Sequence, residues 1–384
     1  MEEKKKRKPI FYALYGAAFL LILLAVLLWH ILTPDREYSA SEKKNLAGLP
    51  AFSLSALTEG RLTQDLDSYA ADQFPLRDRF MNIRTRALML LGQRESNGVY
   101  LGSENSLLQR FEEADEKLSE QTAQAVSDFA ERYPTSKCHF LLVPTAVSML
   151  SERLPAGALN ADENAWMDRF LSQLSPQIDA PDVRSILREA KADGISLYYH
   201  SDHHWTTDAA MAVYEALRED FSYSDTVWKR AVVSNTFRGS LSAKSGYTLP
   251  VYDEVAVYLP EEEADFHMAL LDENRRVKGI SCYDSEALAG NDPYEVFFGG
   301  NYPLLTIETS LDSDRTLLVF KDSYANCFLP FLVRQYSKID MIDPRYFAED
   351  MDVWMAWEQY SDILFLYNAS TLSQDRSLMQ LLGE

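Results

Sequence analysis

Short apolar segments alternate with amphipathic ones through most of this 384-residue chain, and this alternation limits the folds open to it more than any other feature. Residues 139–143, 316–320 and 363–367 are short, mostly apolar runs, which is typical of strands buried in a parallel sheet. We interpret residues 195–199 and 339–342 as two further strands. Because parallel strands are joined by long crossover connections, helices are expected between these runs.

Segments of helical length lie in the intervals between the apolar runs. We interpret as helices residues 112–132, 162–175, 182–191, 206–217, 325–336 and 372–382. Residues 61–92 also have a helical pattern, which Pro75 is expected to break. Residues 231–310 are rich in turns and short strands and are interpreted as an insertion. The predicted fold is therefore α/β, with a doubly wound, mostly parallel sheet flanked by helices.

The N-terminal segment is apolar over a length that suits a membrane. Residues 4–8 form a basic cluster, and a run of 23 largely apolar residues follows at 10–32. As a helix, this run would span roughly 30 Å, the thickness of the hydrocarbon core of a bilayer. It is longer than the core of a typical signal peptide, so an uncleaved signal anchor is favoured over a cleaved signal.

The basic cluster also predicts an orientation. By the positive-inside rule, residues 1–9 form a cytoplasmic tail and the anchor at 10–32 is followed by an extracytoplasmic region. Residues 33–60 are polar and are interpreted as a linker. Residues 61–384 then form the extracytoplasmic domain, with 231–310 as the insertion within it.

The distribution of charge separates the anchor from the domain. The net charge of the chain is −21, and residues 1–33 carry five Lys or Arg and two Glu, a net of +3, so residues 34–384 carry −24. An acidic domain is unsuited to nucleic acid, whose phosphates need basic partners. It is equally unsuited, as a whole, to docking on anionic lipid. We interpret the acidity as a means of keeping an exported domain dispersed.

Cysteine usage does not indicate a disulfide framework. The chain has three cysteines, Cys138, Cys282 and Cys327, and their number is odd and their spacing wide. Cys138 and Cys327 lie beside apolar segments and are expected to be buried as small hydrophobic residues.

Ser323 is the first residue with a plausible chemical role. It follows the predicted strand 316–320 and opens a predicted helix, which places it at the carboxyl edge of a parallel sheet, where open α/β sheets hold their sites. Backbone N–H groups of the next turn are then close enough to bind an oxyanion. The alternative is that Asp322 and Ser323 are ordinary helix caps, since both residue types are preferred there.

A cluster of histidines supplies the other half of a catalytic group. Three of the six histidines lie at positions 200, 203 and 204, beside Asp202. A serine nucleophile needs a base, and the base needs a carboxylate that fixes its tautomer. Because residues i and i+2 of an extended segment point to the same side, the Asp202 carboxylate is expected beside the His204 ring.

Two alternatives remain for this segment. His200, Asp202, His203 and His204 also offer nitrogen and oxygen ligands suited to zinc. Adjacent histidines rarely reach one ion, however, and we favour a site without metal. Trp205 is interpreted as a packing residue or as a platform that stacks on a sugar.

Several motifs occur together in an order that is recognisable. They are Asp72-Gln-Phe-Pro-Leu-Arg77, Asn97-Gly-Val-Tyr-Leu-Gly102, Val143-Pro-Thr145, Tyr198-Tyr-His-Ser-Asp-His-His-Trp-Thr206, Phe237-Arg-Gly-Ser240 with Ser245-Gly246, and Lys321-Asp-Ser-Tyr-Ala-Asn326. In these motifs the chain resembles the DHHW protein family of Gram-positive bacteria and, more distantly, the SGNH-hydrolase-like proteins of alginate O-acetylation. The resemblance covers nearly the whole region that follows the anchor.

The resemblance implies roles for individual residues. Asp202 and His204 match the acid and base of the Asp-x-His-Trp segment, and Ser323 matches the nucleophile. His203 falls on the variable position, and Lys321 replaces the usual Gly before Asp-Ser. The histidine segment precedes the serine, which reverses the order of ordinary SGNH hydrolases as if by circular permutation.

Other residues are candidates for oxyanion or substrate binding. They are Asn301, Asn326, Tyr324, Arg345, His203 and Trp205, each of which has a structural role as its alternative.

The resemblance implies a membrane-anchored, cell-surface acyl transferase or esterase that adds acetyl groups to a surface polysaccharide or removes them. Its partners would be the polysaccharide, an acyl donor and a membrane protein of the acetylation system, and no cofactor is expected. The alternative is a catalytically inactive SGNH-like scaffold or glycan-binding component of a polysaccharide acetylation complex.

Overall fold

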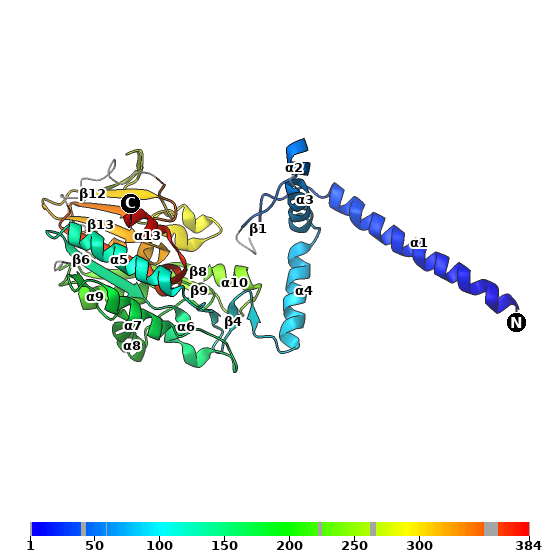
Figure 1. The fold of residues 1–384 in the computed structure, drawn as a ribbon, viewed down its shortest axis with the longest axis horizontal. Coiled ribbons are helices and arrows are strands. Elements are labelled where there is room, and N and C mark those ends of the chain that lie inside the picture. Colours follow the sequence, from blue (N-terminus) through cyan, green and yellow to red (C-terminus); the bar gives the residue numbers. More distant parts are fainter. Residues whose placement is uncertain are drawn as a thin grey trace. The chain divides into compact units, whose positions relative to one another are not determined.

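The computed structural model of the chain describes residues 2–39, 44–58, 60–221, 225–261, 266–348 and 360–383, without the side chains of residues 2–10. The chain divides into two units, Met1–Gln93 and Arg94–Glu384. Residues 61–93, which the sequence analysis assigns to the domain, lie in the first unit. Figure 1 shows the mainly helical first unit and the second unit, which contains both helices and strands.

The first unit consists mainly of helices. Helix α1 (Glu2–Leu32) contains a segment of 22 residues, Phe11–Leu32, that is long and apolar enough to cross a membrane. None of its residues is buried within the protein. A two-stranded ribbon of β1 (Tyr38–Ser39) and β2 (Lys44–Asn45) follows, and then α2 (Leu54–Thr58), α3 (Arg61–Asp72) and α4 (Arg77–Leu90). The predicted break at Pro75 is confirmed, because α3 ends before this residue and α4 begins after it.

The Asp72-to-Arg77 motif has a structural role within the first unit. The Asp72 carboxylate accepts hydrogen bonds from Ala47 N at 3.1 Å and Lys44 Nζ at 2.9 Å, and Arg77 lies 3.4 Å away. Gln73 bonds to both the N–H and the carbonyl of Arg36. The motif thus ties the segment after α1 to the junction of α3 and α4.

An eight-stranded sheet forms the centre of the second unit. Its strand order is β11 (Val277–Gly279), β10 (Met268–Asp272), β12 (Leu304–Thr309), β14 (Lys338–Ile342), β13 (Thr316–Lys321), β15 (Asp362–Asn368), β6 (Lys137–Val143) and β7 (Ile178–Asp179). The pairings from β14 to β7 are parallel, and those from β11 to β14 are antiparallel. The predicted strands at 139–143, 316–320, 339–342 and 363–367 are confirmed, and all lie in the parallel part.

Aromatic side chains pack one helix onto the centre of the sheet. Phe320 and Phe365, on neighbouring strands, stack at 5.0 Å, and Phe140 continues the row at 5.7 Å from Phe365. Phe129 of α5 (Glu116–Arg132) meets Phe320 edge-on at 5.3 Å. Helix α5 therefore covers this face of the sheet. Further helices occur where they are predicted, namely α7 (Glu163–Gln173), α8 (Val183–Ala192) and α9 (Thr207–Leu217), with Thr206 as the cap of α9.

The segment interpreted as an insertion contributes to the main sheet. Strands β10, β11 and β12 extend the parallel strands on the antiparallel side. Strands β8 (Trp228–Phe237) and β9 (Asp253–Pro260) form a separate hairpin. Strands β3 (Glu95–Ser96) and β4 (Val99–Leu101) form a short hairpin that turns at residues 97–98 and is joined by β5 (Leu107–Gln109).

Three predicted elements differ from the structure. Residues 195–199 form no strand of the sheet: Tyr198 instead makes an isolated bridge with Trp205, within the loop that carries the histidines. The helix predicted at 325–336 is wrong: two 3-10 turns, η4 (Ser323–Cys327) and η5 (Leu329–Phe331), replace it, because Pro330 supplies no N–H to a continuous helix. The helix at 372–382 is two helices, α12 (Ala369–Gln374) and α13 (Ser377–Leu382).

Cys138, Cys282 and Cys327 are buried free thiols.

Candidate active site

Ser323 stands on a tightly held turn at the carboxyl end of β13. The preceding Asp322 is completely buried, and one of its carboxylate oxygens accepts from Tyr324 N at 2.8 Å. The other oxygen accepts from the backbone N and the side-chain Nδ2 of Asn368, at 2.8 and 2.6 Å. Asn368 ends β15, so two neighbouring strands fix the turn that presents Ser323. Burial raises the pKa of Asp322, and these hydrogen bonds oppose that rise.

A second loop, residues 198–206, reaches the same edge without being a strand. Asp253, at the start of β9, holds it from one side by accepting from His200 N at 2.6 Å and from Ser201 N at 2.8 Å. The Ser201 hydroxyl also donates to Asp253, at 2.5 Å. Asp253 is therefore a structural residue of this site, and its distance in sequence hid it from the sequence analysis.

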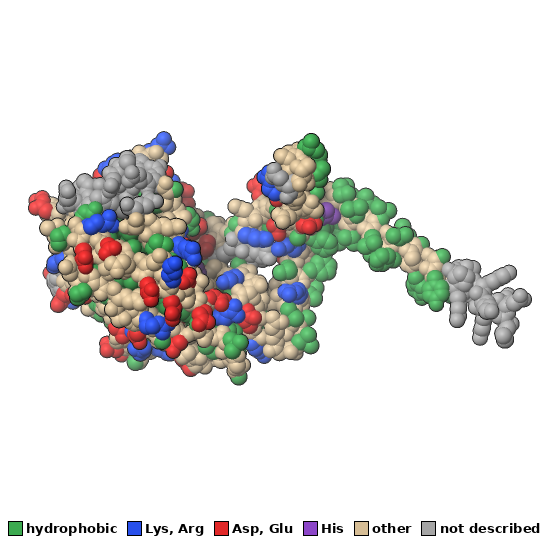
Figure 2. Space-filling model, viewed as in Figure 1, with side chains coloured by type: hydrophobic (Ala, Val, Ile, Leu, Met, Phe, Trp, Pro, Cys, Tyr) green, Lys and Arg blue, Asp and Glu red, His purple; other side chains and the backbone are tan. Residues whose placement is uncertain are grey.

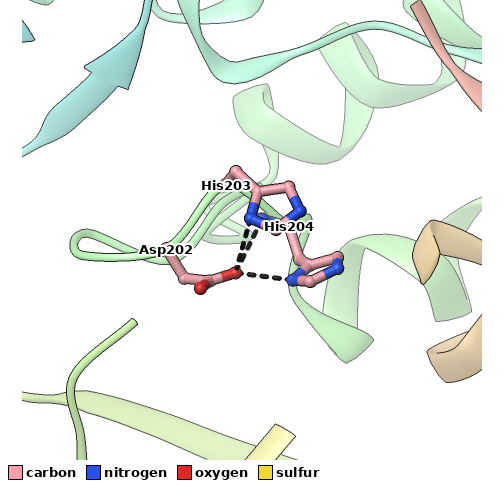
Figure 3. A group of neighbouring side chains, drawn as sticks. All are labelled: Asp202, His203 and His204. Carbon is pink, nitrogen blue, oxygen red and sulfur yellow. Dashed lines mark hydrogen bonds and ion pairs between the residues drawn. The ribbon is translucent and has the colours of Figure 1, made fainter. Parts of the chain in front are cut away.

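The two loops bring together the serine, histidine and aspartate that the sequence singles out. His204 Nε2 lies 2.8 Å from Ser323 Oγ, and His204 Nδ1 lies 2.6 Å from Asp202 Oδ1. Asp202 Oδ1 also accepts from His204 N at 2.9 Å. Figure 3 shows the Asp202 carboxylate turned toward the two histidine rings. This is the geometry in which a carboxylate orients an imidazole and the imidazole takes a hydroxyl proton.

The Asp202 carboxylate is held in its charged form by its neighbours. Burial opposes its ionisation, but His204 and His203, together with the hydrogen bonds it accepts, outweigh burial and hold its pKa well below the usual range. One of these bonds comes from Ser240 N at 2.7 Å to Oδ2. Gly239 lies directly against it, because a Cβ at that position would stand 2.1 Å from the Asp202 Cβ.

Aromatic rings lie against the His204 imidazole. Tyr294 stacks on it with ring centroids 4.0 Å apart and planes 13° apart, and its hydroxyl donates to the Ser323 carbonyl at 3.2 Å. The His203 ring lies 3.8 Å from that of His204, and His203 Nδ1 is 2.7 Å from Ser240 Oγ. Burial, and then the neighbouring His204, lower the pKa of His203, which favours its neutral form. No sequence signal pointed to Tyr294.

The ligand atoms of Asp202, His203 and His204 lie within 4.8 Å of one another, so they are close enough to hold a metal ion. Both ring nitrogens of His204 already have partners, however, in Asp202 and Ser323. His200 is separate, with its Nδ1 at 3.1 Å from Asp253. The arrangement therefore suits a hydrogen-bonded relay better than a tetrahedral zinc site.

Comparisons with known proteins bear on the fold that carries these residues. Residues 100–242, which include Asp202 and His204, match the family model of the SGNH hydrolase-like domain, acetyltransferase AlgX. A DHHW family protein from Eubacterium siraeum has a similar structure, with a TM-score of 0.62, 20% sequence identity, and coverage of 74% of this chain and 96% of that one. The fold is SGNH-hydrolase-like. The resemblance to DHHW proteins expected from the motifs is thereby confirmed.

PatB1 from Bacillus cereus, solved with a sulfonyl adduct, is also similar, with a TM-score of 0.59 and 20% identity. It is covered over 99% of its length by 74% of this chain. No curated protein matches the chain.

The remaining candidates surround this SGNH-like site in different ways. Trp205 is fully buried and its Nε1 donates to the Tyr324 carbonyl, so of its two interpretations only packing fits. Tyr324 is also buried, and its hydroxyl donates to the His203 carbonyl. These two residues join the histidine loop to the serine turn.

Lys321, two residues before Ser323, organises a polar network with two asparagines. Its Nζ donates to Asn326 Oδ1 at 2.8 Å and to Asn301 Oδ1 at 3.2 Å, and lies 3.9 Å from Asp343. Burial lowers the pKa of Lys321 to about 8, and Asp343 opposes this. Arg345 pairs with Asp343 through two hydrogen bonds of 2.8 and 2.6 Å. Because the Asn301 oxygen is engaged, its Nδ2 is the group left to donate.

A pocket with a volume of about 310 Å³ adjoins the site and is lined in part by His203, Ser240, Tyr324 and Asn368. Gln109, Lys244 and Ser370 also line it, and their side chains have no hydrogen-bond or ion-pair partner within the described part of the chain. These groups could contact the hydroxyls or charged substituents of a ligand.

Proposed function

We propose that this protein is a membrane-anchored serine acyl transferase or esterase in which Ser323 is the nucleophile, His204 the base and Asp202 the residue that orients His204. The relay of 2.6 and 2.8 Å contacts carries this proposal, because it joins residues 119 positions apart in the sequence. If Ser323 were only a helix cap, its hydroxyl would not need a histidine ring nitrogen within hydrogen-bond distance.

The reaction follows from these contacts. Ser323 Oγ attacks the carbonyl carbon of an acetyl ester while His204 Nε2 takes the hydroxyl proton, and Asp202 stabilises the imidazolium. The tetrahedral intermediate collapses, and His204 returns the proton to the departing alcohol. A sugar hydroxyl or water then attacks the acetyl-serine and gives its proton to His204. As the bond between the acetyl group and Ser323 Oγ breaks, His204 returns that proton to Oγ, which regenerates the serine. The Asn301 Nδ2 and the backbone around Ser323 are the candidates for oxyanion binding.

A surface polysaccharide is the proposed acceptor. The matching family model describes an acetyltransferase domain, and PatB1 carries a sulfonyl adduct, the product expected when a sulfonyl reagent modifies a nucleophile. The free amide, ammonium and hydroxyl groups of Gln109, Lys244 and Ser370 suit a carbohydrate ligand. Helix α1 would anchor the protein, with residues 1–9 in the cytoplasm and the second unit outside, where a membrane protein would supply the acyl donor.

The test uses the full-length protein in lipid nanodiscs and Ser323→Ala. Hydrolysis of p-nitrophenyl acetate should fall by at least about 10³-fold in kcat, as expected when the nucleophile of such a relay is removed. A sulfonyl fluoride should label Ser323 in the wild-type protein, and His204→Gln should slow that labelling.

Ser172→Ala is the matched control, because the Ser172 hydroxyl lies on α7 and, among the residues that the structure describes, bonds to Arg169 O alone. It should retain wild-type kcat. Unchanged activity in Ser323→Ala, or labelling of another residue alone, would contradict the assignment. A protein that is folded but inert toward both reagents would favour the scaffold.

A further inference from the structure

Helix α4 in the first unit exposes a continuous apolar stripe. Phe80, Ile83, Ala87 and Leu90 follow one another at spacings of three, four and three residues, which places them on one face of a helix. The exposed fractions of Phe80, Ile83 and Leu90 are 54%, 63% and 89%, and Leu91 just beyond the helix is 83% exposed. Figure 2 shows hydrophobic side chains gathered along α4. Isolated exposed apolar residues are ordinary, but a stripe along a whole helix is not.

Arginines border this stripe on both sides. On a projection with about 100° per residue, Arg84 lies at one edge, and Arg79 and Arg86 lie at the other. All three are exposed, and none of their guanidinium groups has a hydrogen-bond or ion-pair partner within the described residues. Residues 77–90 contain four Arg and one Asp, a net of +3, although residues 34–384 together carry −24. The positive charge is therefore local to α4.

The buried side of α4 lies opposite the stripe. Thr85 is the buried residue of this helix, and on the same projection it stands about 180° from the middle of the stripe. Packing within the first unit thus uses the other face and leaves the stripe outward. At 14 residues, α4 would be about 21 Å long, too short to cross a bilayer.

We propose that α4 lies in the plane of the interface of the bilayer that α1 spans. The apolar stripe would rest on the acyl chains, and Arg79, Arg84 and Arg86 would contact anionic lipid headgroups, the arrangement of an interfacial helix. Two observations favour lipid over a protein partner: a span of 22 residues belongs to the same unit, and cations border both edges of the stripe. This inference rests on the proposed anchoring by α1 and is independent of the chemistry at Ser323.

The test places a spin label at single cysteines in the full-length protein in nanodiscs that contain phosphatidylglycerol. The native cysteines are buried, and unmutated protein treated with the label is the blank. Labels at Phe80, Ile83 and Leu90 should collide more with oxygen and less with a water-soluble nickel chelate than a label at exposed Asn82. These three labels should lie about 5–10 Å deep in the boundary between the lipid headgroups and the acyl chains. In phosphatidylcholine alone, or in R79Q/R84Q/R86Q, this contrast should decrease.

The opposite results are distinguishable. Equal access of nickel to all four α4 positions, or stripe labels shielded from both reagents, would overturn the proposal, the second because protein would then cover the stripe. A label at Leu24 in α1 must be in the bilayer, and a Leu24 label in water would overturn the anchoring and the α4 proposal together. Hydrolysis of p-nitrophenyl acetate in the same samples reports separately on Ser323.

Discussion

Adding one methyl group at Gly239 should disable the site while leaving the fold intact. Gly239 has φ −84° and ψ −177°, an extended conformation that alanine adopts freely, so Gly239→Ala introduces no backbone strain. The new Cβ would stand 2.1 Å from the Asp202 Cβ and 2.5 Å from both its Cα and its Oδ2. The effect is therefore expected to come from displacement of Asp202, the residue bonded to His204 Nδ1.

The magnitude follows from the distances. Carbon atoms in contact prefer about 3.5–4.0 Å, so Asp202 and residue 239 must separate by more than about 1 Å. A shift of that size carries the 2.6 Å bond between Asp202 and His204 Nδ1 beyond hydrogen-bond range. Misplacement of a catalytic group by about 1 Å can cost about 10²-fold, or about 2.7 kcal/mol of transition-state stabilisation. We expect kcat of Gly239→Ala to fall by about that factor.

The assay is acetyl-ester hydrolysis by Gly239→Ala, Asp202→Asn and the control Gly48→Ala, whose added Cβ meets no atom within 4 Å. Gly239→Ala should approach Asp202→Asn, and Gly48→Ala should match the wild type. Circular dichroism would establish that the sheet is retained. A folded Gly239→Ala protein within about threefold of wild-type kcat would refute the reasoning, because the steric contact would then have been relieved without disturbing His204.

Two further substitutions test the surroundings of the site. Tyr294→Phe keeps the ring that stacks on His204 and should retain kcat. Tyr294→Leu should lower kcat about two- to tenfold, because a stacked pair contributes about 0.5–1.5 kcal/mol. Equal losses in the two variants would assign the effect to the hydroxyl instead. Glu163 accepts a hydrogen bond from Thr145, and burial raises the pKa of its carboxyl group from 4.5 to about 7. Between these two pH values the folded protein therefore binds more protons than the unfolded chain. Its free energy of unfolding falls as the pH rises through this range. In urea unfolding at pH 5 and pH 7, the wild type should lose at least about 1 kcal/mol relative to Glu163→Gln, and parallel changes in both proteins would contradict this.

The sequence predicts the residues of the proposed catalytic group better than it predicts the residues that hold them in place. The two-residue spacing of Asp202 and His204 places carboxylate and ring together, and the apolar run before Ser323 places the serine at the sheet edge. Gly239 and Asp253 lie tens of residues away on the β8–β9 hairpin, and their contacts depend on a tertiary arrangement that no local pattern encodes. Tyr294 stands in a turn-rich segment, where an aromatic residue is equally suited to packing.

The fold was predictable where the local pattern and the tertiary environment agree. The four apolar runs of the parallel sheet are strands because they are buried on both faces. Residues 195–199 are also largely apolar, but Tyr198 pairs with Trp205 of the same loop and not with a strand of the sheet. The helix expected at 325–336 neglects Pro330, whose missing N–H interrupts the helical ladder.

Strand β15 has a consequence for how the second unit assembles during synthesis. It comes later in the chain than the other strands of the sheet, yet it lies between β13 and β6. Until β15 emerges from the ribosome, β6 and β13 have no shared neighbour, and Asp322 lacks the Asn368 contacts that hold the serine turn. The earlier strands must therefore wait with unpaired edges, a state that favours aggregation or chaperone binding. Ser323 is thus expected to reach its position beside His204 only after the central gap in the sheet is filled.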